Sequence, residues 1–454
     1  MQLLQHAHHV RVPAYRSLRH LGIGEHRTAP HRRDQVSVGL AQQQGPGVLA
    51  QTPARRLYAL MSLHPTGTFT EDVARAVART DRSAPTNSVA HCLATLHSAG
   101  LYTFAQGRYS MPPQVHQHAR EQALTHLRID WNTRHEAQIR LADHYLATAT
   151  EAGRALLPDA PAPAPTRVYH YSVDPPAFAD PGAAKQWFAN EHLALARVLE
   201  MTHTMGLPSL TAHLAVASWP TYLHHTPDAH WRNGQHAGED AARTWGMRQI
   251  EGLLLVRRAT VLCDQHLPES ALPALRHAAL AYQTVGDRDG LATTWRTTGL
   301  AYLPLGRVEM ARRALQAALA YRRPLNAPAR AIDRLAMAEL ESRTGRHQEA
   351  AGWLRAALAS ATPGSPTEVR IRRQAALTQL EHGDVTGALT TLERALDVAH
   401  AGDPDLMETE LSLTYTAQTK ATTASGRTTR PPRPRGQRRS TPPPHFARQS
   451  PRSR

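Results

Sequence analysis

The chain has 454 residues, of which 41% are apolar and 5% aromatic, so it is long enough for two or three domains. Its formal net charge is +15, but residues 1–50 carry +4 and residues 420–454 carry +10, which leaves +1 for residues 51–419. The body of the protein is nearly neutral, which argues against a basic nucleic-acid-binding fold. The apolar content is mainly Ala and Leu, which favour helices, and an all-α fold is predicted.

The two cysteines and the lack of long apolar runs exclude further classes. Cys92 and Cys263 are far apart in helix-like apolar contexts, so neither a disulfide framework nor a cysteine-based metal site is predicted. No apolar run approaches the roughly 18 residues of a membrane span, and the N-terminus lacks a continuous signal-peptide core. We therefore expect a soluble, cytoplasmic protein with no membrane partner.

The chain begins with a segment, residues 1–50, that lacks sustained periodicity and is predicted to be disordered. Residues 51–129 are predicted to form a winged-helix-like domain, because three short helices precede two strands around a Gly turn. The first helix is expected at 54–63, the second begins after an N-cap at Thr70, and the third is expected at 86–98. The two strands are expected at 101–104 and 108–111.

A long helix and a linker separate this domain from the C-terminal half. Residues 130–157 are predicted to form a connecting helix, with Ile139, Ala142 and Leu146 on one face. Residues 158–182 contain seven prolines and are predicted to be a linker. An α-solenoid is expected over 183–424, ending in a capping helix, and a disordered Arg/Pro-rich tail over 425–454.

An internal repeat is the most specific feature of the sequence. An A-x3-L-x2-A pattern recurs at spacings of 40, 39 and 38 residues, and another small residue lies twelve positions before each pattern. Small residues at fixed offsets allow two antiparallel helices to pack closely, so each period is predicted to be a helix–turn–helix pair. The patterns begin at Ala271, Ala311, Ala350 and Ala388, and the preceding small residues are Ala259, Gly299, Ala338 and Ala376.

One unit closely resembles the tetratricopeptide repeat, with Trp295, Gly299, Tyr302, Gly306 and Ala311 at signature places. The other units keep the Ala and Leu places but lack the Trp and Tyr. The turn within each pair contains Gly306, Gly345 or Gly383, whereas the first unit has His266 there. A generic Ala-rich helical bundle is the simpler alternative, and the constant offsets argue against it.

The whole order of segments resembles the C-terminal part of bacterial NB-ARC–tetratricopeptide regulators, which are signal-transduction ATPases with numerous domains (STAND). The resemblance covers about residues 50–415 and includes the Trp187-Phe188-Ala189-Asn190-Glu191 helix start and the Gly286–Gly290 connection. It implies that the repeats sense a partner. However, the chain contains only two lysines, neither after a Gly-rich loop, so a P-loop is absent. Met111-Pro112-Pro113 stands where the family has Met-His-Asp. The hypothesis is a truncated or diverged member that no longer switches with nucleotide.

No catalytic, cofactor or metal site is predicted. The 28 histidines show no H-E-x-x-H pattern, and no nucleophile elbow or paired-carboxylate motif stands out. The favoured function is therefore a non-catalytic protein-interaction or scaffold module in signalling or transcription regulation. Its partner is expected to be a protein or peptide of acidic character, bound in a groove along the first helices of the pairs. The predicted groove residues are Arg296, Leu300, Leu303, Leu335, Glu339, Arg370, Arg373 and Leu377.

Two alternatives accompany this prediction. The groove arginines could instead be ordinary solvated side chains. The protein could also be a DNA-binding transcriptional regulator that uses the winged helix and the basic ends, although the third helix, 86–98, contains no Arg or Lys to read a major groove. Nucleic-acid binding through the basic termini is the less favoured function.

Overall fold

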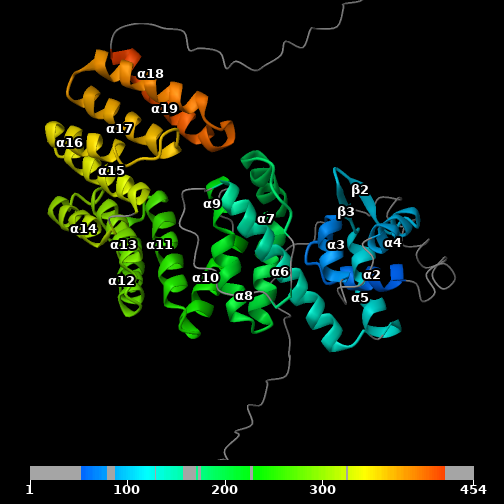
Figure 1. The fold of residues 1–454 in the computed structure, drawn as a ribbon. Coiled ribbons are helices and arrows are strands. Elements are labelled where there is room, and N and C mark those ends of the chain that lie inside the picture. The colour runs from blue at the N-terminus through cyan, green and yellow to red at the C-terminus, as the bar shows by residue number, and fades with distance from the viewer. Residues whose placement is uncertain are drawn as a thin grey trace, which may run out of the picture.

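A computed structural model describes residues 53–78, 87–127, 129–156, 170–171, 175–224, 229–323 and 326–424 (Figure 1). Both predicted disordered ends, residues 1–50 and 425–454, lie outside these ranges, as does most of the predicted 158–182 linker. Within the described residues the chain is almost wholly helical, and its C-terminal half is an α-solenoid of tetratricopeptide-like helix pairs. The predicted fold class is confirmed.

The N-terminal elements are three helices and a small antiparallel sheet. The sheet has the strand order β1-β3-β2, and Phe69 of β1 pairs with Tyr109 of β3. The sequence predicted the β2–β3 hairpin but not β1, because two residues are too few to show an alternating pattern. This order of elements is that of a winged helix, and the assignment of that domain stays a prediction. The elements are α2 (Pro53–Met61), β1 (Thr68–Phe69), α3 (Glu71–Ala78), α4 (Asn87–Ser98), β2 (Thr103–Ala105) and β3 (Arg108–Ser110).

The next helices form one continuous hydrophobic core with this sheet and its helices. Buried apolar side chains from Ala54 to Leu254 belong to a single cluster, which crosses the predicted boundaries at 130, 158 and 183. The cluster is continuous because α6 packs against α3 on one side and against α7 and α8 on the other. The elements are α5 (Pro113–Glu121), the π-helical turn Gln122–His126, α6 (Trp131–Leu156), α7 (Pro181–Thr204), α8 (Pro208–Ala217), α9 (Trp219–His224) and α10 (Ala229–Thr244).

A buried chain of polar side chains joins the sheet to α6 and α7. His64 Nε2 lies 2.9 Å from Tyr145 Oη, and Tyr145 donates to Glu191 Oε2 at 2.8 Å. Glu191 is also ion-paired with Arg108 of β3. Burial, assisted by the Arg108 charge, lowers the pKa of His64 to about 3, so its ring is neutral. Because the Tyr145 proton is directed at Glu191, the His64 Nε2 proton is directed at Tyr145.

The solenoid consists of four regular pairs followed by a single helix (Figure 1). All anchor residues of the repeat are buried, and the alanine anchors are fully inaccessible to solvent. The final helix, α19, packs on α17 and α18 and also meets α7, and its role as a capping helix stays a prediction. The pairs are α11 (Arg248–Asp264) with α12 (Pro268–Thr284), α13 (Arg288–Tyr302) with α14 (Val308–Tyr321), α15 (Ala327–Arg343) with α16 (His347–Leu358), and α17 (Pro366–Glu381) with α18 (Val385–Ala401), followed by α19 (Pro404–Ala424).

The turns inside the pairs need a left-handed residue. Gly306 adopts φ 68° between α13 and α14, and the equivalent glycines of the next two pairs do the same. His266 takes this place in the first pair with φ 61°, a conformation that is unfavourable for a residue with a side chain. The constant helix–turn–helix geometry therefore persists where the sequence lacks the glycine.

Two helical glycines test whether close approach within a pair requires a residue without a side chain. A Cβ at Gly299 would lie 2.6 Å from the buried Leu315 side chain and 3.2 Å from the Ala311 carbonyl oxygen, whereas a Cβ at Gly352 would meet nothing within 4 Å. We expect Gly299→Ala to lower the free energy of unfolding by about 1 kcal/mol or more through overpacking. Gly352→Ala should raise it by about 0.5–1 kcal/mol, because alanine favours the helix. Urea denaturation measures both effects, and stabilisation by both variants would contradict the packing argument.

Candidate functional site

The predicted groove residues lie on the first helices of three successive pairs: three on α13 or its C-cap, two on α15 and three on α17. Their charged members all have partners within the chain. Arg296 lies 3.2 Å from Asp333, and Glu339 lies 2.8 Å from Arg343. Arg370 and Arg373 both pair with Glu410 of α19. A ligand in this groove would have to compete with these ion pairs.

All of these ion pairs except Glu339–Arg343 connect a helix pair to the element that follows it. Arg296 with Asp333 and Arg373 with Glu410 are each separated by 37 residues, close to one repeat period. Asp333 is completely buried and also accepts hydrogen bonds from Arg322 Nε at 2.7 Å and Nη2 at 3.2 Å. This ion pairing between neighbouring units was not predicted from the sequence, although the sequence does place an Arg and an acid about one period apart.

The groove leucines contribute to packing between neighbouring pairs. Leu335 is 9% exposed and belongs to the cluster that joins α15, α16 and α17. Leu300 and Leu303 are half-buried against the α14–α15 cluster, and Leu377 is half-buried against α18 and α19 residues. The eight residues therefore form three separate groups that help stack the solenoid, and their use as a partner groove stays a prediction.

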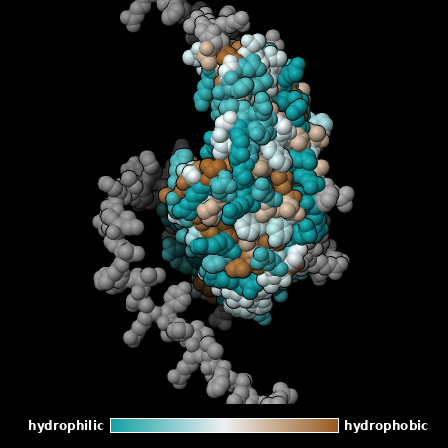
Figure 2. Space-filling model, turned by 90° about the vertical axis from the view of Figure 1, so that its left-hand side faces the viewer, coloured by the Kyte–Doolittle hydropathy of each residue, from teal (hydrophilic) through white to brown (hydrophobic). Residues whose placement is uncertain are grey.

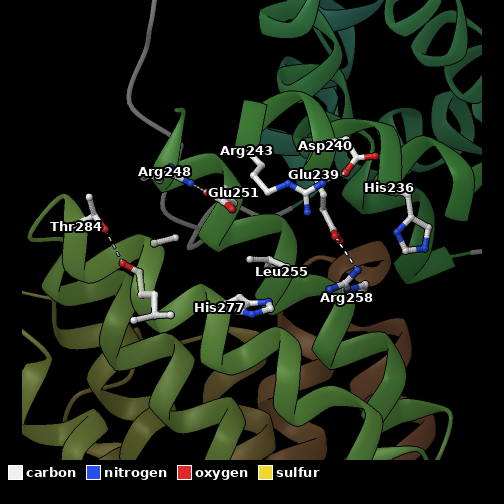
Figure 3. Close-up of a pocket in the computed structure, with 12 residues that line it drawn as sticks. His236, Glu239, Asp240, Arg243, Arg248, Glu251, Leu255, Arg258, His277 and Thr284 are labelled. Atoms are coloured by element: carbon white, nitrogen blue, oxygen red, sulfur yellow. Dashed lines mark hydrogen bonds and ion pairs between the residues drawn. The ribbon is translucent and has the colours of Figure 1, made fainter. Parts of the chain in front are cut away.

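A pocket of about 420 Å³ lies between α10, α11 and α12 (Figure 3). This pocket was not predicted from the sequence. Three ion pairs surround it. Arg258 lies 2.8 Å from Glu239, Arg248 lies 2.6 Å from Glu251, and Arg243 lies 2.5 Å from Asp240. The pocket thus combines three acids and three arginines from two adjacent helices, with Leu255 and His277 also in its wall.

The charges of the pocket are arranged by depth. The side chains of Glu239 and Glu251 are 9% and 11% exposed, whereas those of Arg258, Arg248 and Arg243 are 34%, 39% and 65% exposed. Burial raises the pKa of Glu239 to about 7, although the Arg258 charge opposes this shift. The floor of the pocket is therefore acidic, and its rim, where Asp240 is 58% exposed beside the three arginines, is mainly basic.

Exposed large apolar side chains lie at and beside the pocket. Leu280 lines it and is 60% exposed. Trp245, which lies in sequence between the pocket residues Arg243 and Arg248, is 68% exposed, and Val285 follows the pocket residue Thr284 and is also exposed. On the face shown in Figure 2, apolar residues form small patches within a mainly hydrophilic surface. Such residues at the edge of a pocket are typical of a contact surface.

The described ranges hold neither a cluster of metal ligands nor a membrane-spanning helix. No group of three or more His, Cys, Asp and Glu residues there could hold a metal ion. None of the helices that the structure describes has both the length and the apolar composition required to cross a bilayer.

Comparisons with known proteins give a distant structural likeness. No protein-family model matches the sequence, and no curated protein matches it. Among solved structures, a similar chain is a signal-transduction ATPase with numerous domains from Pyrococcus horikoshii, which carries a tetratricopeptide-repeat sensor. The two are 10% identical with a TM-score of 0.39, and the match covers 87% of this chain and 56% of that chain. No residue-level correspondence follows from this degree of similarity.

Removal of the Asp333 carboxylate tests the role of the inter-pair ion pairs. Asp333→Asn leaves the charges of Arg296 and Arg322 without their shared buried partner, so we expect a loss of about 3–5 kcal/mol in the free energy of unfolding. Glu339→Gln removes a partly exposed ion pair within one helix and should cost less than about 1 kcal/mol. Urea denaturation distinguishes the two variants, and equal small losses would show that Asp333 does not hold neighbouring pairs together.

The pH dependence of stability tests the acidic floor. Glu239 ionises near 4.5 when unfolded but near 7 in the folded protein, so between these values the folded state holds more protons and the free energy of unfolding falls as pH rises. This loss is nearly complete at about pH 8. Glu239→Gln removes it, so the variant should gain about 1–3 kcal/mol relative to the wild type between pH about 4.5 and about 7.5. Denaturation curves across this range measure the gain, with Asp240→Asn as the control for an exposed pocket acid; a constant difference would contradict the shift.

Proposed function

We propose that this protein is a non-catalytic interaction module of a signalling system, which binds a partner protein through its solenoid. The observation that carries the proposal is the surface at α10–α12, where exposed Trp245, Leu280 and Val285 lie at or beside a pocket with an acidic floor and a basic rim. A central apolar contact next to desolvated charges is the usual composition of a protein-binding hot spot. A role in transcription regulation is compatible with this proposal.

The predicted groove of the first helices is retained as a second, weaker contact surface. Its arginines are engaged with Asp333 and Glu410, so an acidic partner gains affinity only by displacing these carboxylates. The α10–α12 surface needs no such displacement for its apolar contacts. We therefore assign the first contact with the partner to α10–α12.

Direct DNA reading is disfavoured by the charges of the N-terminal elements. The β2–β3 hairpin and its turn contain one cation, Arg108, and this side chain is ion-paired with the buried Glu191. α4, at the place of a recognition helix, has neither Arg nor Lys. We propose that residues 51–129 serve as a winged-helix-like spacer, connected through the 130–157 helix to a solenoid over 183–424. In line with the missing P-loop, the chain acts without nucleotide.

The proposal is tested by one pair of surface substitutions. Leu280→Glu places a charge at the edge of the pocket, where Leu280 is 60% exposed, and Met310→Glu places one at an apolar position on α14 that is 47% exposed. We expect the wild type and Met310→Glu to capture the same partner from extracts of cells that make the protein, while Leu280→Glu captures at least about tenfold less. Quantitative mass spectrometry measures the captured protein.

Two results would contradict this function. Equal capture by Leu280→Glu would exclude the α10–α12 surface. Loss of all captured proteins after nuclease treatment would show that nucleic acid, and not a partner protein, is what the chain binds.

A further inference from the structure

We infer that the pocket between α10, α11 and α12 binds a basic side chain, lysine or arginine, of the partner, with its cationic group at Glu239 and its alkyl stem against Leu255, Leu280 and Ala281. This inference deepens the proposed function, because it rests on partner binding at this surface and states the chemistry that the surface selects.

The arrangement of charges by depth favours a cation at the floor. The two carboxylates nearest the floor, Glu239 and Glu251, are far less exposed than any of the three arginines around them. A cation that enters the pocket therefore passes the basic rim and reaches a place where two acids are held in a poorly solvated setting, where electrostatic attraction is stronger than in water. The arginines at the rim are placed to bind backbone carbonyl groups or acidic neighbours in the same partner segment.

An unsatisfied hydrogen-bond acceptor points to the same ligand. Glu239 Oε2 pairs with Arg258, but Oε1 is buried and has no hydrogen-bond partner among the residues that the structure describes. A buried acceptor without a donor is unfavourable, and an incoming ammonium or guanidinium group would supply the missing donor. The torsion that turns a carboxyl group is broad, so a modest rotation presents the free oxygen to such a group.

The rest of the wall suits an alkyl stem. Leu255 and Ala281 are buried, and Leu280 is largely exposed at the mouth, so apolar surface extends from the opening inwards. Lysine and arginine bury their methylene stems on apolar surface and keep the charged head in a polar setting. An anionic ligand would instead have to place its charge beside Glu239 and Glu251.

Short degenerate peptide pools with one fixed central residue test the inference on the full chain. Fluorescein-labelled pools with lysine, arginine, norleucine or glutamate at that position are titrated and followed by fluorescence anisotropy. We expect the lysine or the arginine pool to bind wild type at least about tenfold more tightly than the norleucine pool. Glu239→Gln should abolish this preference, and Glu309→Gln, which alters an exposed acid on α14 outside the pocket, should retain it.

Several outcomes would overturn the inference. The inference is wrong if the wild type binds the norleucine pool as tightly as the lysine and arginine pools, or if it prefers the glutamate pool. It is also wrong if a folded Glu239→Gln variant keeps the preference for lysine or arginine. Urea denaturation verifies that the variant is folded. Failure here is distinguishable from failure of the proposed function, because capture of the native partner by Met310→Glu and its loss in Leu280→Glu do not depend on which side chain enters the pocket.

Discussion

The close approach of the two helices in each pair is the constraint on which the solenoid depends. Alanine or glycine occupies each crossing position, and these residues are fully buried where α11–α18 pair. A larger side chain there would push the helices apart, as the contact between Gly299 and Leu315 shows. Tyr282 of α12 illustrates the same constraint within and between pairs, since its ring lies against Gly252 of α11 in its own pair and Gly290 of α13 in the next, where a Cβ on either glycine would clash. Small residues thus set both the width of a pair and the stacking of neighbouring pairs.

Buried polar groups then fix how these units are joined. Asp333 holds Arg296 and Arg322 together across two pairs, and Glu410 connects the capping helix to α17. At the other end, Tyr145 and Glu191 connect β3 and the loop after α2 to α6 and α7. These contacts are directional and are satisfied within the described chain, so they specify the relative placement of elements that apolar packing alone leaves less defined.

The arginines therefore have two separate uses in this protein. Those facing the next pair, such as Arg296 and Arg373, are partly buried and bind a carboxylate one period away. Those around the α10–α12 pocket are more exposed and surround acids that lie deeper than themselves. The second arrangement combines a cavity with a buried carboxylate oxygen, Glu239 Oε1, that accepts no hydrogen bond from the described residues, which is why the proposed partner contact is placed there.

The all-α class and the repeated helix pairs from α11 to α18 could be predicted from the sequence alone, because both depend on local composition and on small residues at fixed offsets. The sequence also indicated the β2–β3 hairpin from the turn at Gln106-Gly107. Three other features depend on contacts between elements that lie apart in the sequence, so they could not be predicted from sequence patterns. β1 forms only because β3 offers it an edge, the groove arginines turn inward because Asp333 and Glu410 arrive from the next repeat, and the pocket exists because three helices enclose it. Burial, which depends on all of these neighbours, is what raises the pKa of Glu239 and makes that carboxylate a candidate for binding.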